Sequence, residues 1–376
     1  MATAKRFEAP KGRKWDGATL LVGPGLALLV LGELGSRISP EWVAVLAPFG
    51  ITYGVGWTLT AAGVAWRLVS FRWLKVVLPL AVLVGTWPTL SLVFSLGAGS
   101  GQHAVEEGTA WGLVSFNVRR LDEFGWLEGD QTRSRLAAWF NDQSAEVWCL
   151  QEFPAGGEAT LRKAGWDREG RKVLAWPKGA GPAVVTAFPV LGWEAWMFGP
   201  EAGKGRVVQA DVKTPAGPVR VFNVHLQSLH FSKEDYAAVE EGPNREQGRR
   251  LFSLLTQAYK ARAAQVEELR LHLAESPYPV VVAGDFNDSP VSYALRQLRK
   301  SGLHDSFEAA GFGVGSTHVG MVPGLRIDGV LGDSTLAFSA HRVHDVVLSD
   351  HRPVEVALGR RKTSPTDGQT TVEGTP

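Results

Sequence analysis

Long apolar stretches mark the first hundred residues of the chain. Three stand out, at about residues 18–35, 42–66 and 73–97; the second has no charged residue and the third has none after Lys75. A membrane-spanning helix needs about 20 apolar residues, which the second and third stretches exceed. The first is shorter and carries Glu33, so a signal peptide is an alternative interpretation. A signal peptide would be followed by a cleavage site and soluble sequence, whereas here another hydrophobic stretch follows. The pattern predicts three transmembrane helices within residues 18–97.

From about residue 110 the apolar runs become short. The middle of three amphipathic stretches, near 131–142, 245–275 and 291–301, is the longest and has apolar residues at helical spacing. Strands outnumber helices and the links between them are short, which favours two sheets packed face to face with helices outside. The predicted strands are Trp111–Phe116, Val147–Leu150, Ala183–Thr186, Val207–Val212, Val219–Phe222, Pro279–Ala283 and Val343–Leu348.

Positively charged residues cluster at alternate ends of the predicted spans. Residues 1–17 contain five Lys or Arg and the second connection contains three, whereas the first connection has only Arg37 and residues 97–110 have none. Positive-inside bias then places residues 1–17 and the second connection in the cytoplasm. Three spans deliver the rest of the chain to the outside of the cell membrane. Trp42, Trp66 and Trp73 fall near span ends, where indole rings suit the headgroup region.

Composition divides the chain further. The Gly/Ser-rich run at 97–101 predicts a flexible linker over residues 98–109, and residues 360–376, without apolar periodicity, predict a disordered tail. Residues 1–75 carry a net charge of +5 and residues 76–376 a net charge of −4. The overall charge therefore gives no sign of the basic stripe that strong nucleic-acid binding requires. A net charge does not exclude a local basic groove. Cys149 is the only cysteine, so no intrachain disulfide forms, and we expect a buried thiol.

Six polar segments follow or end the apolar runs. A rigid sheet can aim groups at its strand ends toward one point, so we interpret the segments together as a divalent-metal phosphoesterase site. In chain order they are Ser115-Phe116-Asn117, Leu150-Gln151-Glu152, Asn223-Val224-His225, Gly284-Asp285-Phe286-Asn287, Arg326-Ile327-Asp328 and Ser349-Asp350-His351-Arg352-Pro353.

The carboxylates among them suit metal and water chemistry. Glu152 ends an apolar strand, where its charge is costly to bury without a positive partner; Mg²⁺ prefers such oxygen ligands, and a salt bridge to an arginine is the alternative. Asp285 and Asn287 share one face if the strand pleat persists, as a water-orienting carboxylate and a phosphate-contacting amide require. An Asx turn that closes the strand is the other interpretation.

Two histidines, His225 and His351, each follow an apolar strand. A histidine needs a partner that fixes its tautomer before it can donate to a phosphoryl oxygen, and Asp328 is a candidate partner for one of them. A structural role is the alternative for both. Seven other histidines lack such settings and are expected to be structural: His103, His230, His272, His304, His318, His341 and His344.

The ordered set of segments resembles the endonuclease/exonuclease/phosphatase superfamily, which is DNase I-like, over about residues 110–358. The resemblance implies an α/β fold, a four-layered α/β sandwich of two mainly antiparallel sheets flanked by helices, here as a catalytic domain over residues 110–359 preceded by the three predicted transmembrane helices. It implies in-line attack of a metal-assisted water on phosphorus, with Mg²⁺, or alternatively Mn²⁺, as the cofactor. Matched by motif, the implied metal ligands are Asn117, Glu152 and Asp350, the water activator is Asp285, the phosphate contact is Asn287, the transition-state groups are His225 and His351, and Asp328 holds His351.

One position departs from the pattern of apurinic-type nucleases. Arg119, followed by Arg120, stands where those enzymes have an acidic residue, which puts a second metal in doubt. Arg119 is a candidate substrate-phosphate contact, with a solvated strand-end pair as the alternative. Residues 228–260 also lack a counterpart in the minimal nuclease pattern and are candidates to pack over the mouth of the site. The whole set is most similar to membrane-tethered bacterial members of the superfamily.

Three hypotheses follow from these patterns. The first is a phosphoesterase anchored in the lipid bilayer, multi-pass and with an extracytoplasmic catalytic domain, that acts on a lipid headgroup or small phosphorylated molecule. The second is an extracellular endonuclease or exonuclease on DNA or RNA, whose activity would fall steeply with salt. The third is a non-catalytic membrane receptor or scaffold, which the complete set of polar residues disfavours. No protein partner can be inferred.

Overall fold

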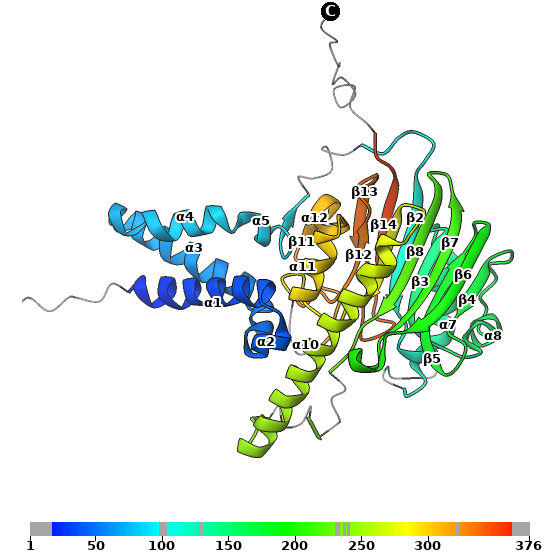
Figure 1. Ribbon diagram of the computed structural model, residues 1–376, viewed down its shortest axis with the longest axis horizontal. Helices are drawn as coiled ribbons and strands as arrows, with labels where there is room; N and C mark the ends of the chain where they lie inside the picture. The colour runs from blue at the N-terminus through cyan, green and yellow to red at the C-terminus, as the bar shows by residue number, and fades with distance from the viewer. Residues whose placement is uncertain are drawn as a thin grey trace, which may run out of the picture.

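The computed structural model (Figure 1) describes residues 17–97 and 104–362, apart from 126, 128, 130, 230–233, 236, 237, 239, 240 and 321–323. The predicted basic segment up to residue 16, the first half of the predicted linker and the predicted tail from residue 363 lie outside the described residues.

Two six-stranded sheets form the body of the molecule. Two pairs of neighbours, β2–β3 and β8–β9, are parallel, and the other pairs are antiparallel. The first sheet has the order β13 (Leu336–Val343), β14 (Val354–Arg360), β2 (Trp111–Asn117), β3 (Val147–Pro154), β5 (Ala180–Thr186), β4 (Lys172–Ala175). The second has the order β10 (His304–Asp305), β12 (Asp328–Gly332), β9 (Val280–Asp285), β8 (Gly217–His225), β7 (Arg206–Thr214), β6 (Val190–Met197).

The sheets pack face to face, with helices on their outer faces. Apolar side chains from both sheets, such as Leu113 and Cys149 of the first and Val221 and Val281 of the second, form one buried cluster between them. A second cluster joins the outer face of the second sheet to α10 (Arg245–Ala274) and α11 (Tyr293–Lys300), and a third joins the first sheet to α7 (Thr132–Asp142) and α8 (Gly157–Lys163). The predicted four-layered α/β sandwich is confirmed. The shorter elements are α6 (Arg119–Asp122), η4 (Pro200–Ala202) and α12 (Ser306–Ala310).

Local sequence accounts for the longest helix. The Asn244 side chain accepts hydrogen bonds from the backbone N–H groups of Glu246 and Gln247, and the Gln247 side chain accepts one from the Asn244 N–H, so a capping box begins α10.

One predicted strand is wrong. The run Val343–Leu348 leaves strand β13 at Val343 and continues as a loop, which a hydrogen bond from the His344 N–H to the Pro353 carbonyl closes. Val346 and Leu348 give the sequence a strand-like alternation of apolar residues, because the loop packs both side chains against the cluster beneath α7. In the two six-stranded sheets, strands β4, β6, β10, β12 and β14 and most of β13 were not predicted.

The N-terminal helices extend away from the sandwich as a separate layer, with α1, α3 and α4 side by side (Figure 1). We call residues 17–97 the helical module. Glycine allows α1 and α3 to approach closely, since a Cβ at Gly25 would lie 2.4 Å from the Thr60 hydroxyl and one at Gly63 would lie 2.4 Å from Val22. The elements of the module are α1 (Thr19–Arg37), α2 (Pro40–Val43), η1 (Ala44–Gly50), α3 (Tyr53–Val69), η2 (Trp73–Lys75), α4 (Val77–Gly85), α5 (Trp87–Leu90) and β1 (Ser95–Leu96), which pairs with β11 (Phe312–Gly313).

The helical module differs from three uninterrupted spans. Among the described residues, only Thr19–Arg37 is one helix long and apolar enough to cross a membrane; Pro40–Gly50 and Tyr53–Val69 meet that test only together, bent by 55°. The third predicted span is helical as Trp73–Gly85, which is shorter, and then turns into α5 and β1. Pro48 lies within the 3-10 helix η1 and Pro88 at the start of α5, shortly after α4 ends, and each lacks the N–H that a continuous α-helix needs.

Part of the predicted linker is held in place. Val105 forms an isolated β-bridge with Arg361, and the Lys362 N–H donates to the Ala104 carbonyl. Residues 104–109 therefore lie along the end of β14.

Candidate active site

Strand ends bring the predicted site residues together at one end of the sandwich. In the second sheet, Asp285 on β9 is in direct register with His225 on β8 and with Asp328 on β12. Asn117 and Glu152 come from β2 and β3 of the first sheet. Gly284 makes the tight pairing possible, because a Cβ there would lie 2.0 Å from the Val224 carbonyl oxygen.

A pocket of about 280 Å³ opens over these strand ends. Of the nine predicted site residues, Glu152, His225, Asp285, Asn287, Asp350 and His351 line it. The other three are linked to those residues: Asn117 bonds to Asp285, Asp328 to His351, and Arg119 pairs with Asp350 at 3.4 Å. The structure therefore gathers all nine residues into one site.

Asn117 connects the two sheets at the floor of this site. Its side-chain N–H donates to the Asp285 carboxylate at 3.0 Å and to that of Glu152 at 3.3 Å, while its carbonyl oxygen accepts the Arg119 N–H. In this arrangement the amide is a donor between two carboxylates. A metal-ligand role for the Asn117 oxygen would require the amide to turn over.

A second inter-sheet link lies below it. The Gln151 side chain donates to the Asn223 oxygen at 2.8 Å, and the Asn223 amide donates to the carbonyls of Leu150 and Ala183. Gln151 and Asn223 are fully buried. Both residues lie within the six polar segments, but no role is predicted for either from the sequence. The available signal is a polar residue in the middle of an apolar strand, which requires a buried partner.

His351 is held by a carboxylate. Its Nδ1 lies 2.9 Å from Asp328 Oδ2, and its Nε2 faces Asp285 at 3.7 Å. Burial alone lowers the pKa of His351, but the charges of Asp328 and Asp285 and the hydrogen bond to Asp328 outweigh it and raise the pKa to about 10. His225 Nε2 also lies 3.7 Å from Asp285 Oδ2, so two imidazoles flank one carboxylate.

His318 also lines the pocket, although its sequence setting suggested a structural role. Its ring centroid is 5.5 Å from that of His351, and the two residues form a β-bridge. Its Nδ1 is buried without a hydrogen-bond partner among the described residues. Burial and the neighbouring His351 lower the pKa of His318. No signal in the flanking sequence indicated this position, because His318 lies in a loop outside the six polar segments.

Backbone strain is concentrated at the site. Glu152 and Asn287 have φ values of 51°, and residues 119–122 have φ values of 42° to 56°. Such left-handed conformations in residues other than glycine cost about 1–3 kcal/mol each and persist where the surroundings impose them. The Asn287 N–H donates to Asp285 Oδ1 at 2.9 Å, so the Asx turn forms and orients the carboxylate of Asp285 within the site.

The donor set fits a hard divalent cation. Glu152 and Asp350 line the pocket beside Asp285, and carboxylate oxygens are the ligands that Mg²⁺ prefers. Asp285, Asp328 and His351 also bring ligand atoms within 4.8 Å of one another. His351 Nδ1 is engaged with Asp328, however, and we interpret this trio as a carboxylate-oriented imidazole.

Carboxylates, amides and paired imidazoles at the strand ends of a two-sheet α/β sandwich define a phosphoester hydrolase of DNase I-like fold. Residues 114–351 match the model of the endonuclease/exonuclease/phosphatase family. The chain belongs to this family and is a phosphoester-hydrolysing enzyme.

The chain is similar to several solved structures. An endonuclease/exonuclease/phosphatase from Bacteroides vulgatus is 19% identical over 67% of this chain and 99% of its own, with a TM-score of 0.51. A family member from Bacteroides thetaiotaomicron is 16% identical over 67% and 98% of the two chains, also with a TM-score of 0.51. A mannosyl-6-phosphatase from Bacteroides thetaiotaomicron is 16% identical over 66% and 99%, with a TM-score of 0.47. No curated protein matches the chain.

Proposed function

We propose that this protein is a membrane-anchored, Mg²⁺-dependent phosphoesterase with an outward-facing catalytic domain, and that its substrate is a lipid headgroup or another small phosphate ester. The observation that carries the proposal is the placement of Asp285. Its carboxylate lies between the imidazoles of His225 and His351 and is fixed by Asn117, at the floor of a pocket large enough for a phosphate ester.

The residues have distinct tasks in this mechanism. Glu152 and Asp350 would hold Mg²⁺, which would neutralise phosphate charge and favour deprotonation of water. Asp285 orients the attacking water and accepts its proton, while His225 and His351 donate to the phosphoryl oxygens and Asn287 contacts the phosphate. The bond from phosphorus to the water oxygen forms as the bond to the leaving oxygen breaks, and the leaving oxygen takes a proton from solvent. Asp328 acts through His351 by holding its imidazole in place.

The surface of the helical module supports the anchor. Helix α1 has 19 residues and is about 28 Å long at about 1.5 Å per residue, close to the ~30 Å hydrocarbon core. Aromatic side chains gather at both ends of the module, as headgroup regions favour. Those at the sandwich end are Trp42 (84% exposed) and Trp87 (51%), and those at the far end are Trp66 (52%), Phe71 (78%) and Trp73 (57%).

Charge supports the orientation. Arg67, Arg72 and Lys75 lie at the far end of the module, where the Arg67 guanidinium bonds to the Lys75 carbonyl and the Thr19 hydroxyl. With these residues on the cytoplasmic side, the sandwich lies outside.

A substrate panel on the full-length chain in detergent tests the proposal. Plasmid DNA, RNA, phospholipid and bis(4-nitrophenyl) phosphate are each incubated with Mg²⁺ or with EDTA, for wild type, Asp285→Ala and the exposed control Asp142→Ala. We expect Mg²⁺-dependent hydrolysis of phospholipid or of the small diester by wild type and Asp142→Ala only. Preferred cleavage of DNA or RNA that weakens steeply with salt would instead establish the nuclease alternative. Equal activity of Asp285→Ala and wild type would refute the mechanism, and inactivity of wild type on every substrate would favour the scaffold.

A further inference from the structure

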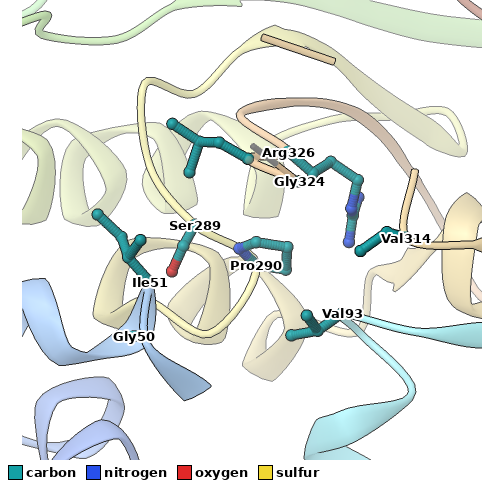
Figure 2. Close-up of a pocket in the computed structure, with 9 residues that line it drawn as sticks. Gly50, Ile51, Val93, Ser289, Pro290, Val314, Gly324 and Arg326 are labelled. Atoms are coloured by element: carbon teal, nitrogen blue, oxygen red, sulfur yellow. The ribbon is translucent and has the colours of Figure 1, made fainter. Parts of the chain in front are cut away.

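A narrow hollow lies between the helical module and the sandwich (Figure 2). Both parts of the chain contribute to it, and its volume is about 50 Å³. We call this hollow the seam. Its lining residues from the module are Gly50, Ile51 and Val93, and those from the sandwich are Ser289, Pro290, Val314, Gly324, Leu325 and Arg326.

Specific contacts fix the two walls of the seam. A Cβ at Gly50 would lie 2.5 Å from the Val291 carbonyl oxygen, so only glycine allows η1 to approach this closely. The buried Arg326 guanidinium donates to the Leu92 carbonyl at 2.8 Å. The Ser91 hydroxyl donates to Glu308 at 2.7 Å. The module therefore has a defined position beside the catalytic pocket.

The seam lies beside the active-site pocket and shares part of its wall. Ile51, Ser289 and Leu325 line both. Ser289 follows Asn287 by two residues, and Ile51 is the helical module's contribution to the wall of the pocket. A ligand in the pocket thus has carboxylates and imidazoles within reach, together with the aliphatic side chains of Ile51 and Leu325, which also line the seam.

Apolar side chains surround the outer part of the seam. Val93 precedes Phe94 and β1, and Val314 follows β11, the strand paired with β1. The exposed residues on and beside this small sheet are Phe94 (43%), Leu96 (57%), Phe312 (77%) and Val314 (48%). An apolar surface at the sandwich end of apolar helices, near Trp87, suits the edge of a bilayer.

We propose that the seam binds the apolar chain of an amphiphilic phosphate ester whose phosphate occupies the catalytic pocket. The inference rests on the proposed function and narrows its substrate class from any small phosphate ester to one with a hydrocarbon chain next to the phosphate. The wall that the seam and the pocket share carries the inference. The helical module then takes part in substrate binding as well as anchoring the enzyme.

A homologous series of diesters tests the seam. The probes are methyl, butyl and octyl 4-nitrophenyl phosphate, and release of 4-nitrophenol by the full-length chain is followed with Mg²⁺ at one fixed detergent concentration. Each methylene group that leaves water strengthens binding by about fourfold until the seam is filled. We therefore expect an octyl-to-methyl ratio of kcat/KM of at least about tenfold.

Two substitutions fill the seam from opposite walls, Ile51→Trp from the module and Val314→Trp from the sandwich. We expect the octyl-to-methyl ratio to fall to about one in both. The matched control is Leu78→Trp, on the exposed side of α4 away from the seam, which keeps the wild-type ratio. Thermal unfolding checks that each variant is folded. If one of the two seam variants does not fold, Val93→Trp is used in its place.

The outcomes separate the two proposals. An octyl-to-methyl ratio of kcat/KM near one in wild type overturns the seam proposal, and so does a ratio that stays high in the folded seam variants. Neither result contradicts the proposed phosphoesterase function. Absence of 4-nitrophenol from every ester overturns the seam proposal, and if phospholipid is not hydrolysed either, the proposed function is overturned as well.

Discussion

The side-chain amide of Asn117 donates to the Asp285 carboxylate at 3.0 Å, and this hydrogen bond joins the first sheet to the second at the catalytic end of the sandwich. Both residues are 1% exposed. Because Asp285 belongs to β9 and Asn117 to β2, the orientation of the proposed water-activating carboxylate depends on how the two sheets pack.

This bond predicts the effect of Asn117→Asp. The change replaces a donor with a third carboxylate between Asp285 and Glu152, so like charges meet in a buried site. We expect kcat/KM for bis(4-nitrophenyl) phosphate to fall by at least about tenfold. Gln257→Glu, an equal change of charge at an exposed position on α10, is the control. Retention of full activity by Asn117→Asp would show that the amide donor is dispensable.

The catalytic roles predict larger losses. We expect Asp285→Ala or His351→Ala to lower kcat by at least about 100-fold, as is usual when a positioned acid–base or transition-state group is removed. His272→Ala is a suitable comparison, because His272 stacks on Trp196 on the outer face, away from the pocket. Steady-state kinetics of wild type and the three variants measure these losses. A loss of kcat in His272→Ala as large as in His351→Ala would argue for a general structural effect.

The proposed metal position predicts a shift in Mg²⁺ dependence. Glu152→Gln removes a charged oxygen ligand, so the Mg²⁺ concentration that gives half-maximal activity should rise by about tenfold or more. EDTA should abolish wild-type activity and added Mg²⁺ restore it. Titration calorimetry with Mg²⁺ gives a readout independent of turnover, and Glu158→Gln on the exposed face of α8 should leave both measurements unchanged.

A buried ion pair beside the seam predicts a stability effect. Arg326 Nη2 lies 2.8 Å from Asp305 Oδ2, and both side chains are about 5% exposed or less. Arg326→Met leaves the carboxylate buried and unpaired, which should lower the free energy of unfolding by about 3–5 kcal/mol. Asp305→Leu in the same chain should recover most of that loss, as measured by chemical denaturation.

The ion pair between Arg326 and Asp305 also predicts how the stability of the fold depends on pH. Burial raises the pKa of Asp305, but the charge of Arg326 and the hydrogen bonds outweigh it and hold the pKa below its usual value. A carboxylate with a depressed pKa stabilises the fold above its unfolded pKa of about 4, and that contribution is lost as the pH falls below about 4. Arg326→Met should weaken this acid-induced loss of stability.

Much of the sandwich could be predicted from the sequence because its central strands are apolar on both faces. Strands β2, β3 and β9 are almost entirely buried and β8 is buried from Val221 to Val224, so each contains a short apolar run whose polar end stands out. Edge strands such as β6 mix exposed and half-buried positions and were missed. The Val343–Leu348 run was misread because a loop can bury alternate residues as a strand does.

The site was predictable where a polar group ends an apolar run and obscure elsewhere. Asp285 and Asp328 follow that rule, whereas His318 reaches the pocket through a loop whose course depends on tertiary contacts. The docking of Ile51 against the site was equally hidden, because hydropathy reports how apolar a segment is and not which surface it meets.

Cys149 lies at the centre of the first sheet with no exposed surface, and burial raises the pKa of its thiol. A thiol that is both protonated and enclosed is inert to alkylating reagents. Because Cys149 is the only cysteine in the chain, no native side chain should react with a thiol-specific label. One cysteine introduced at an exposed position such as Asp345→Cys would react alone with a membrane-impermeant maleimide, and the labelling of intact cells would report which side of the membrane the sandwich occupies.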